Sequence, residues 1–258
     1  MHRKVLFITE GPVDEIHFLA SICSDLGIAE KQRDFYCYRT DFHQFARLML
    51  PDNTNAVDNA LDVLLTLKSY ERNEDNVKIL SAKYTDIFII FDLDPQAIRT
   101  EFSKIHALAS FFTDSSDMGR LYINYPMMQS YKHLKSLPDT DYMTRKVNIS
   151  QIRNYKEIVA QEAVPELVKA HTYSHAQLYE IACHNYCKRE KMLGRDCSIN
   201  SKSTYDGSED LRILEIQLED LTTNQQCSVL NTSSLIYLEY KPKKFFDEVS
   251  RHRQKFRI

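Results

Sequence analysis

The sequence predicts an α/β fold with a central parallel sheet, followed by a mainly helical C-terminal region. Three observations predict it. Short β-branched and aromatic runs alternate with helical periods through the first half of the chain. The run Asp86–Phe91 (DIFIIF) is apolar on both faces, as a central parallel strand should be. Only five Gly and seven Pro occur, so few long loops are expected.

The chain opens with a strand, a tight turn and a helix. Lys4–Thr9 (KVLFIT) is an apolar, β-branched run that predicts a buried strand. Pro12 suits the first turn of a helix, and Asp14 and Glu15 complement the helix dipole there. Apolar residues then follow at helical spacing until Gly27, which is a plausible helix stop.

Three further strands and the helices between them complete the predicted sheet. The strands are Asp34–Arg39, Asp86–Phe91 and Arg120–Asn124. Helical periods cover Phe42–Met49, Asn59–Glu71, Ile98–Phe112 and a short stretch after Tyr125-Pro126 that runs to about Leu137.

The α/β unit is expected to close near Pro138, which gives a catalytic domain at 1–140 and a helical domain at 141–258. A polar loop interrupts the helical part at Gly194–Ser208, and Ser234–Tyr240 fits a strand and a helix equally well. The helices predicted in this region are Ile152–Ala160, Val164–Glu180, Glu180–Leu193 and a period through Leu211, Leu214, Leu218 and Leu221.

Composition and charge narrow the function. The chain is 43% hydrophobic with a net charge of −3, which is typical of a globular protein rather than a stoichiometric nucleic-acid binder. A nuclease is compatible with this balance, because an active site of carboxylates lowers the net charge. A basic stretch near the C-terminus could contact phosphates or form a solvated helix; it contains Lys241, Lys243, Lys244, Arg251, Arg253, Lys255 and Arg257.

The sequence favours a cytoplasmic location. No apolar run reaches the ~18–20 residues of a membrane-spanning helix. The apolar run at Val5–Ile8 is too short for a signal peptide and is followed by Glu10. In a reducing cytosol the six Cys are expected to be free thiols.

Acidic residues follow two of the predicted strands. Glu10 ends the first strand, and Asp92 and Asp94 end the strongest one. If these strands are neighbours, the three carboxylates converge at the sheet edge where open α/β sheets bind ligands. Crowded carboxylates require a cation, and oxygen ligands select Mg²⁺ or Mn²⁺. Each acidic position alone could equally well cap the following helix.

These segments resemble a known family. Ile8–Glu15 (ITEGPVDE) followed by Phe91–Asp94 (FDLD) looks like the Toprim domain of topoisomerases, bacterial primases, small RNA-maturation nucleases and OLD-family nucleases. The resemblance covers about residues 1–140 and implies a Rossmann-like fold whose acids hold Mg²⁺. In OLD-like members a second acid follows the first Glu by one helical turn, and Asp14 is preferred to Glu15 for this position.

A further segment is similar to stand-alone, defence-associated Toprim proteins and RloB-like proteins. Asn124–Tyr131 (NYPMMQSY) places Gln129 where those proteins often have a Glu, so a metal role there is in doubt. Lys132 and His133 follow, and Lys132 is expected to contact a phosphate or the charge developing on it. Both could instead be ordinary surface residues of a helix.

The expected function is therefore a Mg²⁺-dependent (or Mn²⁺-dependent) Toprim endonuclease that cleaves DNA or tRNA. By resemblance, it would be the effector of a bacterial anti-phage system. The part outside 1–140 is too small for topoisomerase or primase machinery. None of the five Gly precedes a Lys, so the chain lacks a Walker A motif, and an ABC- or AAA-type ATPase would be a separate subunit. A homodimer is also expected. The alternative is a non-catalytic Toprim-fold subunit that binds or regulates such an ATPase.

Other patterns carry less. Cys183, His184 and Cys187, with His175 and Cys197 nearby, fit no standard zinc spacing and fall largely within a helical period. The aromatic residues Tyr173, Tyr179 and Tyr186 could stack on unpaired bases but are more typical of a helical core. His17 is interpreted as a residue of the helix surface.

Overall fold

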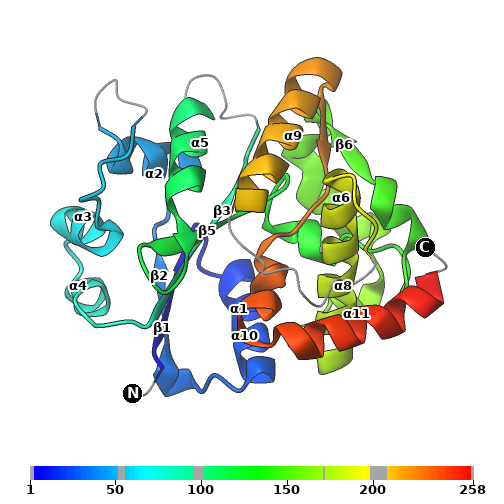
Figure 1. Ribbon diagram of the computed structural model, residues 1–258, viewed down its shortest axis with the longest axis horizontal. Coiled ribbons are helices and arrows are strands. Elements are labelled where there is room, and N and C mark those ends of the chain that lie inside the picture. Colours follow the sequence, from blue (N-terminus) through cyan, green and yellow to red (C-terminus); the bar gives the residue numbers. More distant parts are fainter. Residues whose placement is uncertain (1–2, 52–55, 96–101, 171, 198–207, 257–258) are drawn as a thin grey trace.

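A five-stranded sheet forms the centre of the computed structural model, which describes residues 3–51, 56–95, 102–170, 172–197 and 208–256 (Figure 1). The strand order is β2-β1-β3-β5-β4, and the first four strands are parallel while β4 runs antiparallel at one edge. This confirms the predicted α/β class with its parallel sheet. The strands are β1 (Val5–Thr9), β2 (Arg33–Cys37), β3 (Asp86–Asp92), β4 (Thr113–Asp114) and β5 (Gly119–Asn124).

The central strands β1 and β3 are the most apolar ones, because both of their faces are covered. All five residues of β1 are buried, and most of β3 is buried as well. Phe7 of β1 lies opposite Phe88 of β3, and their ring centroids are 5.4 Å apart. Burial of such side chains is the main favourable contribution to folding. It also fixes the register in which β1 and β3 end side by side.

The helices of the first half agree with the sequence at most positions. Helix α1 ends at Gly27, whose φ of 80° is the left-handed value that favours glycine, and Asp41 caps α2 by accepting the Gln44 N–H. The helix predicted at 59–71 is shorter, and a separate helix follows it because Asn73 caps a new start. Positions 98–101 of the predicted helix 98–112 lie outside the described residues. The helices are α1 (Asp14–Leu26), α2 (Phe42–Met49), α3 (Val63–Tyr70), α4 (Glu74–Leu80) and α5 (Phe102–Phe111).

The second half is mainly helical, as predicted, and is organised around one buried helix. Helix α8 (His175–Met192) is continuous through Glu180, where the sequence predicted a junction of two helices. Every residue from 178 to 190 is buried, so α8 has no solvent-facing side along this stretch. Around it, the structure has α6 (Tyr155–Glu162), α7 (Pro165–Val168), α9 (Ser208–Asn224), α10 (Tyr237–Tyr240) and α11 (Pro242–Phe256).

Short elements in this half were not visible in the sequence. Strands β6 (Lys146–Asn148) and β7 (Gln226–Ser228) form an antiparallel pair of three residues each, too short for a periodic signal. The ambiguous segment at 234–240 is helical: a 3-10 turn, η5 (Ser233–Ile236), leads directly into α10. The short helix expected before Leu137 is the 3-10 helix η2 (Met128–Lys132).

Contacts cross the predicted boundary near residue 140. Tyr125, just after β5, forms a β-bridge with Leu230, and the Thr232 hydroxyl donates to the carbonyl of Ile123 at 2.8 Å. The ring of Tyr240 lies 5.9 Å from that of Phe88 in the sheet. The buried apolar residues of both parts form one cluster. The division into 1–140 and 141–258 stays a prediction, and the two parts share a core.

All six cysteines are free thiols, as predicted. In the part of the chain that the structure describes, none of the helices has the length and apolar character needed to cross a membrane.

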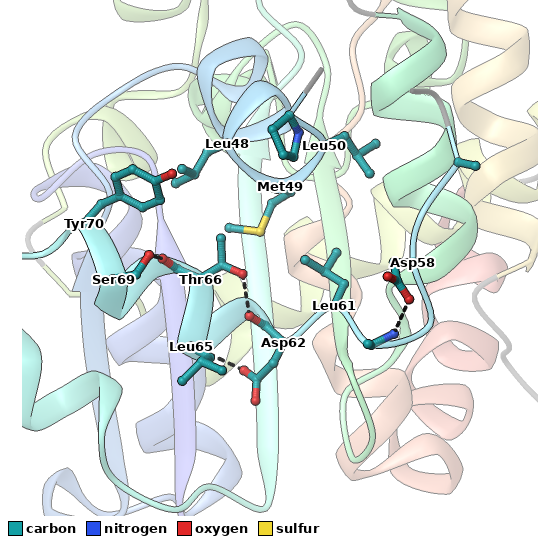
Figure 2. A pocket seen from close by; sticks show the side chains of 13 residues that line it. Leu48, Met49, Leu50, Asp58, Leu61, Asp62, Leu65, Thr66, Ser69 and Tyr70 are labelled. Atoms are coloured by element: carbon teal, nitrogen blue, oxygen red, sulfur yellow. Dashed lines mark hydrogen bonds between the residues drawn. The ribbon is translucent and has the colours of Figure 1, made fainter. Parts of the chain in front are cut away.

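A hollow of about 560 Å³ opens between α2 and α3 (Figure 2). Most of its lining residues are apolar, and Leu65 and Tyr70, which are among them, are 67% and 71% exposed. Its two carboxylates serve the local backbone: Asp62 accepts the Leu65 N–H and Asp58 accepts the Ala60 N–H, both at 2.9 Å. The surface of the hollow that is left for a ligand is therefore largely apolar.

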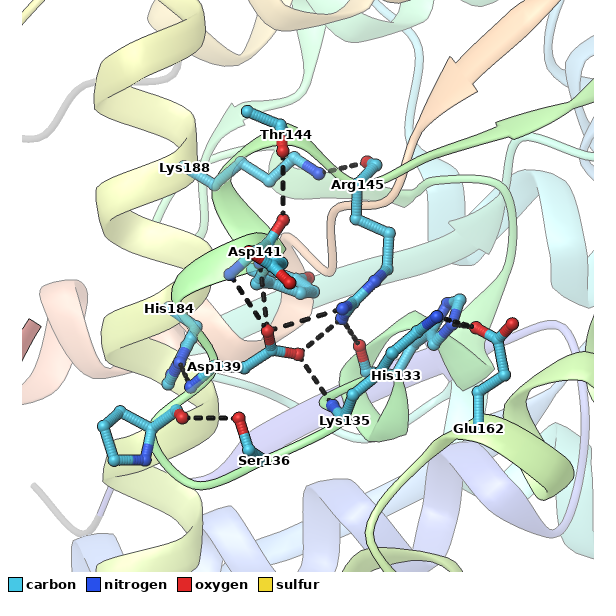
Figure 3. Close-up of polar contacts among 12 residues, drawn as sticks. His133, Lys135, Ser136, Asp139, Asp141, Thr144, Arg145, Glu162, His184 and Lys188 are labelled. Carbon is cyan, nitrogen blue, oxygen red and sulfur yellow. Dashed lines mark hydrogen bonds and ion pairs between the residues drawn. The ribbon is translucent and has the colours of Figure 1, made fainter.

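A buried ion pair joins the end of the α/β part to α8 (Figure 3). The Asp139 carboxylate accepts a hydrogen bond from Arg145 at 2.6 Å and another from the Lys135 N–H at 2.7 Å. Arg145 also donates to the carbonyl of His133, and the Asp139 N–H donates to Nε2 of His184 on α8. Both charged side chains are under 10% exposed, so the pair is stable only while every partner is present.

Replacing Asp139 with Ala should leave Arg145 buried without its counter-charge. We expect Asp139→Ala to lower the free energy of unfolding by about 3–5 kcal/mol, measured by chemical denaturation. The control is Asp141→Ala at an exposed neighbour, where a change under about 0.5 kcal/mol is expected. Equal stability losses in the two variants would contradict this account.

Candidate functional site

Glu10 and Asp92 meet at the carboxyl edge of the sheet, as the sequence predicted. Thr9 of β1 pairs with Ile90 of β3, so the residues after these positions leave the sheet together. The backbone N–H of Asp92 donates to Oε2 of Glu10 at 3.3 Å, although the two residues are 82 positions apart. Two acidic segments that are distant in sequence therefore share one site.

Asp94 also belongs to this edge. The loop that carries it is tied to the loop after β5, since the Leu93 N–H donates to Asn124 and the Asp94 N–H donates to Pro126. Asp94 has a φ of 39°, an uncommon conformation for a residue with a side chain. Its charge contributes to raising the pKa of Glu10. All three carboxylates named from the sequence thus lie in one electrostatic environment.

Glu15, rather than Asp14, faces the Glu10 and Asp92 carboxylates. Its side chain is only 8% exposed, and its charge raises the pKa of both Glu10 and Asp92. It lies directly over Gly11, where an added Cβ would be 2.7 Å from Oε2 of Glu15. Gly11 thus leaves space for this carboxylate, which an added methyl group would push aside. The sequence indicated only a tight turn before the helix, and the helical spacing did not reveal the close approach of Glu15 to Gly11.

Asp14, at the start of α1, binds Gln129 and Lys132 instead of facing Glu10 and Asp92. Its carboxylate accepts a hydrogen bond from Nε2 of Gln129 at 2.7 Å and pairs with Nζ of Lys132 at 3.2 Å. Burial would raise the pKa of Asp14, but the Gln129 hydrogen bond and the Lys132 charge outweigh it and lower the pKa. Asp14 is therefore ionised and paired with Lys132, and this ion pair holds the Lys132 ammonium group beside the site.

Charge crowding is the dominant electrostatic property of the site. Burial, followed by the charges of Glu15, Asp94 and Asp41, raises the pKa of Glu10 to about 7, although the Asp92 N–H opposes this. Burial and the charges of Glu10 and Glu15 raise the pKa of Asp92 well above its usual value. Like charges at this spacing are costly unless a proton or a cation compensates them.

Gln129 has an unused acceptor next to these acids. Its Nε2 donates to Asp14, while its Oε1 is buried and has no hydrogen-bond partner among the described residues. A buried amide oxygen without a donor costs about 1–3 kcal/mol. Gln129 is 6% exposed, so bulk water does not readily meet this need. The oxygen is therefore available to a ligand that donates a hydrogen bond or carries positive charge.

Two basic residues near the site had no signal in the sequence. Lys156 on α6 is exposed, and its charge acts on Asp14, Glu15 and Asp92. Arg39 follows β2 with a φ of 66°, and its N–H donates to the carbonyl of Glu10 at 3.0 Å. Lys156 lies outside the predicted catalytic domain, and Arg39 ends a predicted strand. Only the fold brings them near the acidic residues of this site.

The other groups considered from the sequence have local roles. His17 is exposed on α1, as expected. His184 is buried and bonds to the Asp139 N–H and to the carbonyl of Glu180. Among the residues with described side chains, no three His, Cys, Asp or Glu groups are gathered closely enough, as they stand, to hold a metal ion.

Comparisons of the chain with protein-family models, curated proteins and solved structures found no match. The Toprim resemblance of Glu10, Asp92 and Asp94 accordingly stays a prediction.

Removing one of the crowded charges should stabilise the protein at alkaline pH. The pKa of Glu10 is raised from 4.5 to about 7, so the folded state binds more protons than the unfolded state between these values, and stability falls as pH rises through this window. We expect Glu10→Gln to have a larger free energy of unfolding than the wild type at pH 8 in EDTA. The gain should be about 1 kcal/mol, a value discounted for the partial exposure of Glu10.

The comparison at pH 5 is the internal control. Glu10 is mostly protonated there, so the difference between the two proteins should nearly vanish in the same thermal or urea unfolding experiment. A constant difference at both pH values would show that the carboxylate is not electrostatically strained.

The close approach at Gly11 gives a second prediction. Gly11→Ala should destabilise the protein by about 1 kcal/mol, because the added methyl group displaces the buried end of the flexible Glu15 side chain. In a Glu15→Ala background the same change should cost under about 0.5 kcal/mol, which a double-mutant cycle in urea would measure. Equal costs in the two backgrounds would rule out the contact as the reason for the glycine.

Proposed function

We propose that this chain is a Mg²⁺- or Mn²⁺-dependent endonuclease of the Toprim type, which cleaves phosphodiester bonds in nucleic acid. The observation that carries the proposal is the convergence of Glu10 and Asp92 across two neighbouring parallel strands, with a raised pKa on both carboxyl groups. Such a site stores unfavourable charge that a divalent cation would relieve.

The residues present fit a hard divalent cation. They supply carboxylate oxygens from three elements, and the buried Oε1 of Gln129 lies next to Asp14 without a donor. Glu10, Asp92 and Asp94 would hold the ion, with Glu15 in the position that the sequence assigned to Asp14. The side chains would have to move closer together than they stand. The ion would supply positive charge that stabilises the phosphoryl and leaving oxygens.

Two lysines near the site could bind a phosphate group. Lys132 is 15% exposed and is oriented by its ion pair with Asp14, so its ammonium group is positioned to contact a phosphate at the sheet edge. Lys156 adds a second positive charge from α6. The pKa of about 7 on Glu10 applies without the ion, and binding of the cation would lower it and release the proton.

The biological setting is proposed on the resemblance. DNA or tRNA is the expected substrate, and the expected role is that of the effector of an anti-phage system in the cytoplasm, alongside an ATPase on another chain. Gln129 in place of an acid favours the second candidate, a Toprim-fold subunit that binds metal or partners without turnover. The two candidates differ in one measurable property, which is cleavage.

Incubation of supercoiled plasmid or tRNA with the protein in Mg²⁺ or Mn²⁺ should produce cleavage that EDTA abolishes. Glu10→Gln and Asp92→Asn, which keep the size of the side chains, should each lower the rate by at least about 100-fold, because each removes charge from the proposed ion site. Gel assays and Mn²⁺ binding by calorimetry would measure cleavage and occupancy separately.

The matched control is Glu219→Gln, which removes a carboxylate from the exposed face of α9 and should leave cleavage unchanged. Mn²⁺ binding without cleavage of either substrate would favour the regulatory subunit. Cleavage by the Asp92→Asn variant at the wild-type rate would exclude the proposed site.

A further inference from the structure

A cavity of about 310 Å³ lies in the C-terminal half of the chain. It is bordered by the 3-10 helix η3 (Thr140–Thr144), the strands β6 and β7, and the helices α8 and α9. Its lining shares no residue with the carboxylate site described above. The lining residues are Met143, Thr144, Lys146, Lys188, Lys191, Met192, Ile216, Asp220 and Ser228.

Positive charge is in excess in this cavity. Three of its lining residues are lysines, against one aspartate. Lys146 is neutralised by an ion pair with Asp220. Within the described residues, no carboxylate forms an ion pair with Lys188 or Lys191. Lys188 and Lys191 therefore share a hollow in which the lining carboxylate, Asp220, is already paired with Lys146.

Lys188 is the unusual member, because it is almost fully buried. It is 1% exposed, and its Nζ donates one hydrogen bond, to the carbonyl of Arg145 (Figure 3). The ring of Tyr142 lies 4.9 Å from Nζ and offers its π face. An ammonium group has three donors, so two have no acceptor among the residues that the structure describes. A buried cation in this condition is costly unless another group completes its surroundings.

The surroundings of Lys188 disfavour its charged form. Burial, together with the positive charges of Arg145, Lys146 and Lys191, lowers the pKa of Lys188 well below its usual value. Tyr142 and Cys227 also face Lys188, while Asp220, which lines the same cavity, is paired with Lys146. An anion in the cavity would reverse this balance and favour the ammonium form.

We propose that this cavity binds a phosphate group through Lys188 and Lys191. Lysine is a common phosphate ligand, acting as a point charge with several donors. The hydroxyl-bearing residues Thr144 and Ser228 line the same hollow and add polar partners. The volume of about 310 Å³ is at the lower end of ligand-pocket sizes, so it suits a phosphate that carries a small organic group. The ligand class is a phosphate monoester, either free as a mononucleotide or at the 5′ end of a nucleic acid.

Inorganic phosphate is the first probe, titrated into the full chain in EDTA and compared with chloride at equal ionic strength. Calorimetry should detect millimolar phosphate binding to the wild type, accompanied by proton uptake, because the anion returns Lys188 to its charged form. EDTA excludes divalent ions, so the outcome is independent of the nuclease proposal. Phosphate that binds no better than chloride would overturn this proposal.

Two variants assign the site. Lys188→Met should weaken phosphate binding by about 10-fold or more, the value expected for a charged hydrogen bond. Lys191→Met changes an exposed side chain that tolerates substitution, and it should weaken binding about 3-fold through the loss of one nearby charge. The control is Lys83→Met, an exposed lysine outside the cavity, with unchanged binding. Wild-type affinity in both cavity variants would contradict the assignment.

Competition then identifies the source of the phosphate. A 5′-mononucleotide that displaces phosphate while a 5′-phosphorylated single strand does not would support a small free ligand. If the 5′-phosphorylated strand displaces phosphate and its unphosphorylated form does so only weakly, the natural ligand is the 5′ end of a nucleic acid. Equal displacement by phosphorylated and unphosphorylated strands would contradict recognition of a monoester.

Discussion

Repulsion among carboxylates at one edge of the sheet is the constraint on which the functional reading of this structure depends. β1 and β3 are buried together because their side chains are apolar on both faces, and that burial forces Glu10 and Asp92 into contact where the strands end. The favourable hydrophobic term is spread over the whole sheet, whereas the unfavourable charge term is local. A fold can therefore tolerate a strained group of this kind at its rim, and strained groups often mark function.

The helix that follows β1 divides its two acids between opposite tasks. Asp14 forms an ion pair with Lys132 and accepts a hydrogen bond from Gln129, so it organises the basic side of the site. Glu15 is packed above Gly11 and adds to the negative side. Adjacent residues on a helix point about 100° apart, which explains how one turn of chain serves both sides. This arrangement also explains why position 129 is a neutral Gln. Its amide donates a hydrogen bond to Asp14, which a carboxylate could not do unless it were protonated.

Much of this arrangement could be predicted from the residues. The four parallel strands, the glycine stop of α1 and the meeting of Glu10 with Asp92 followed from apolar patterning and from the rule that parallel strands end at a common edge. The choice between Asp14 and Glu15 did not follow, because helical spacing places both near the site and only the contacts of Gln129 and Lys132 separate them. Lys156 and the cavity around Lys188 were hidden, since both depend on contacts between elements that are far apart in the sequence.

The position of Lys156 has a consequence for dissecting the protein. Its charge acts on three acids of the α/β part, yet it lies on α6, beyond residue 140, where the sequence predicts that part to end. The bridge between Tyr125 and Leu230 likewise joins the end of β5 to the second half of the chain. A fragment cut after residue 140 would lose this counter-charge and expose apolar surface that the second half covers. Such a fragment is a poor stand-in for the intact chain in crystallisation or screening work.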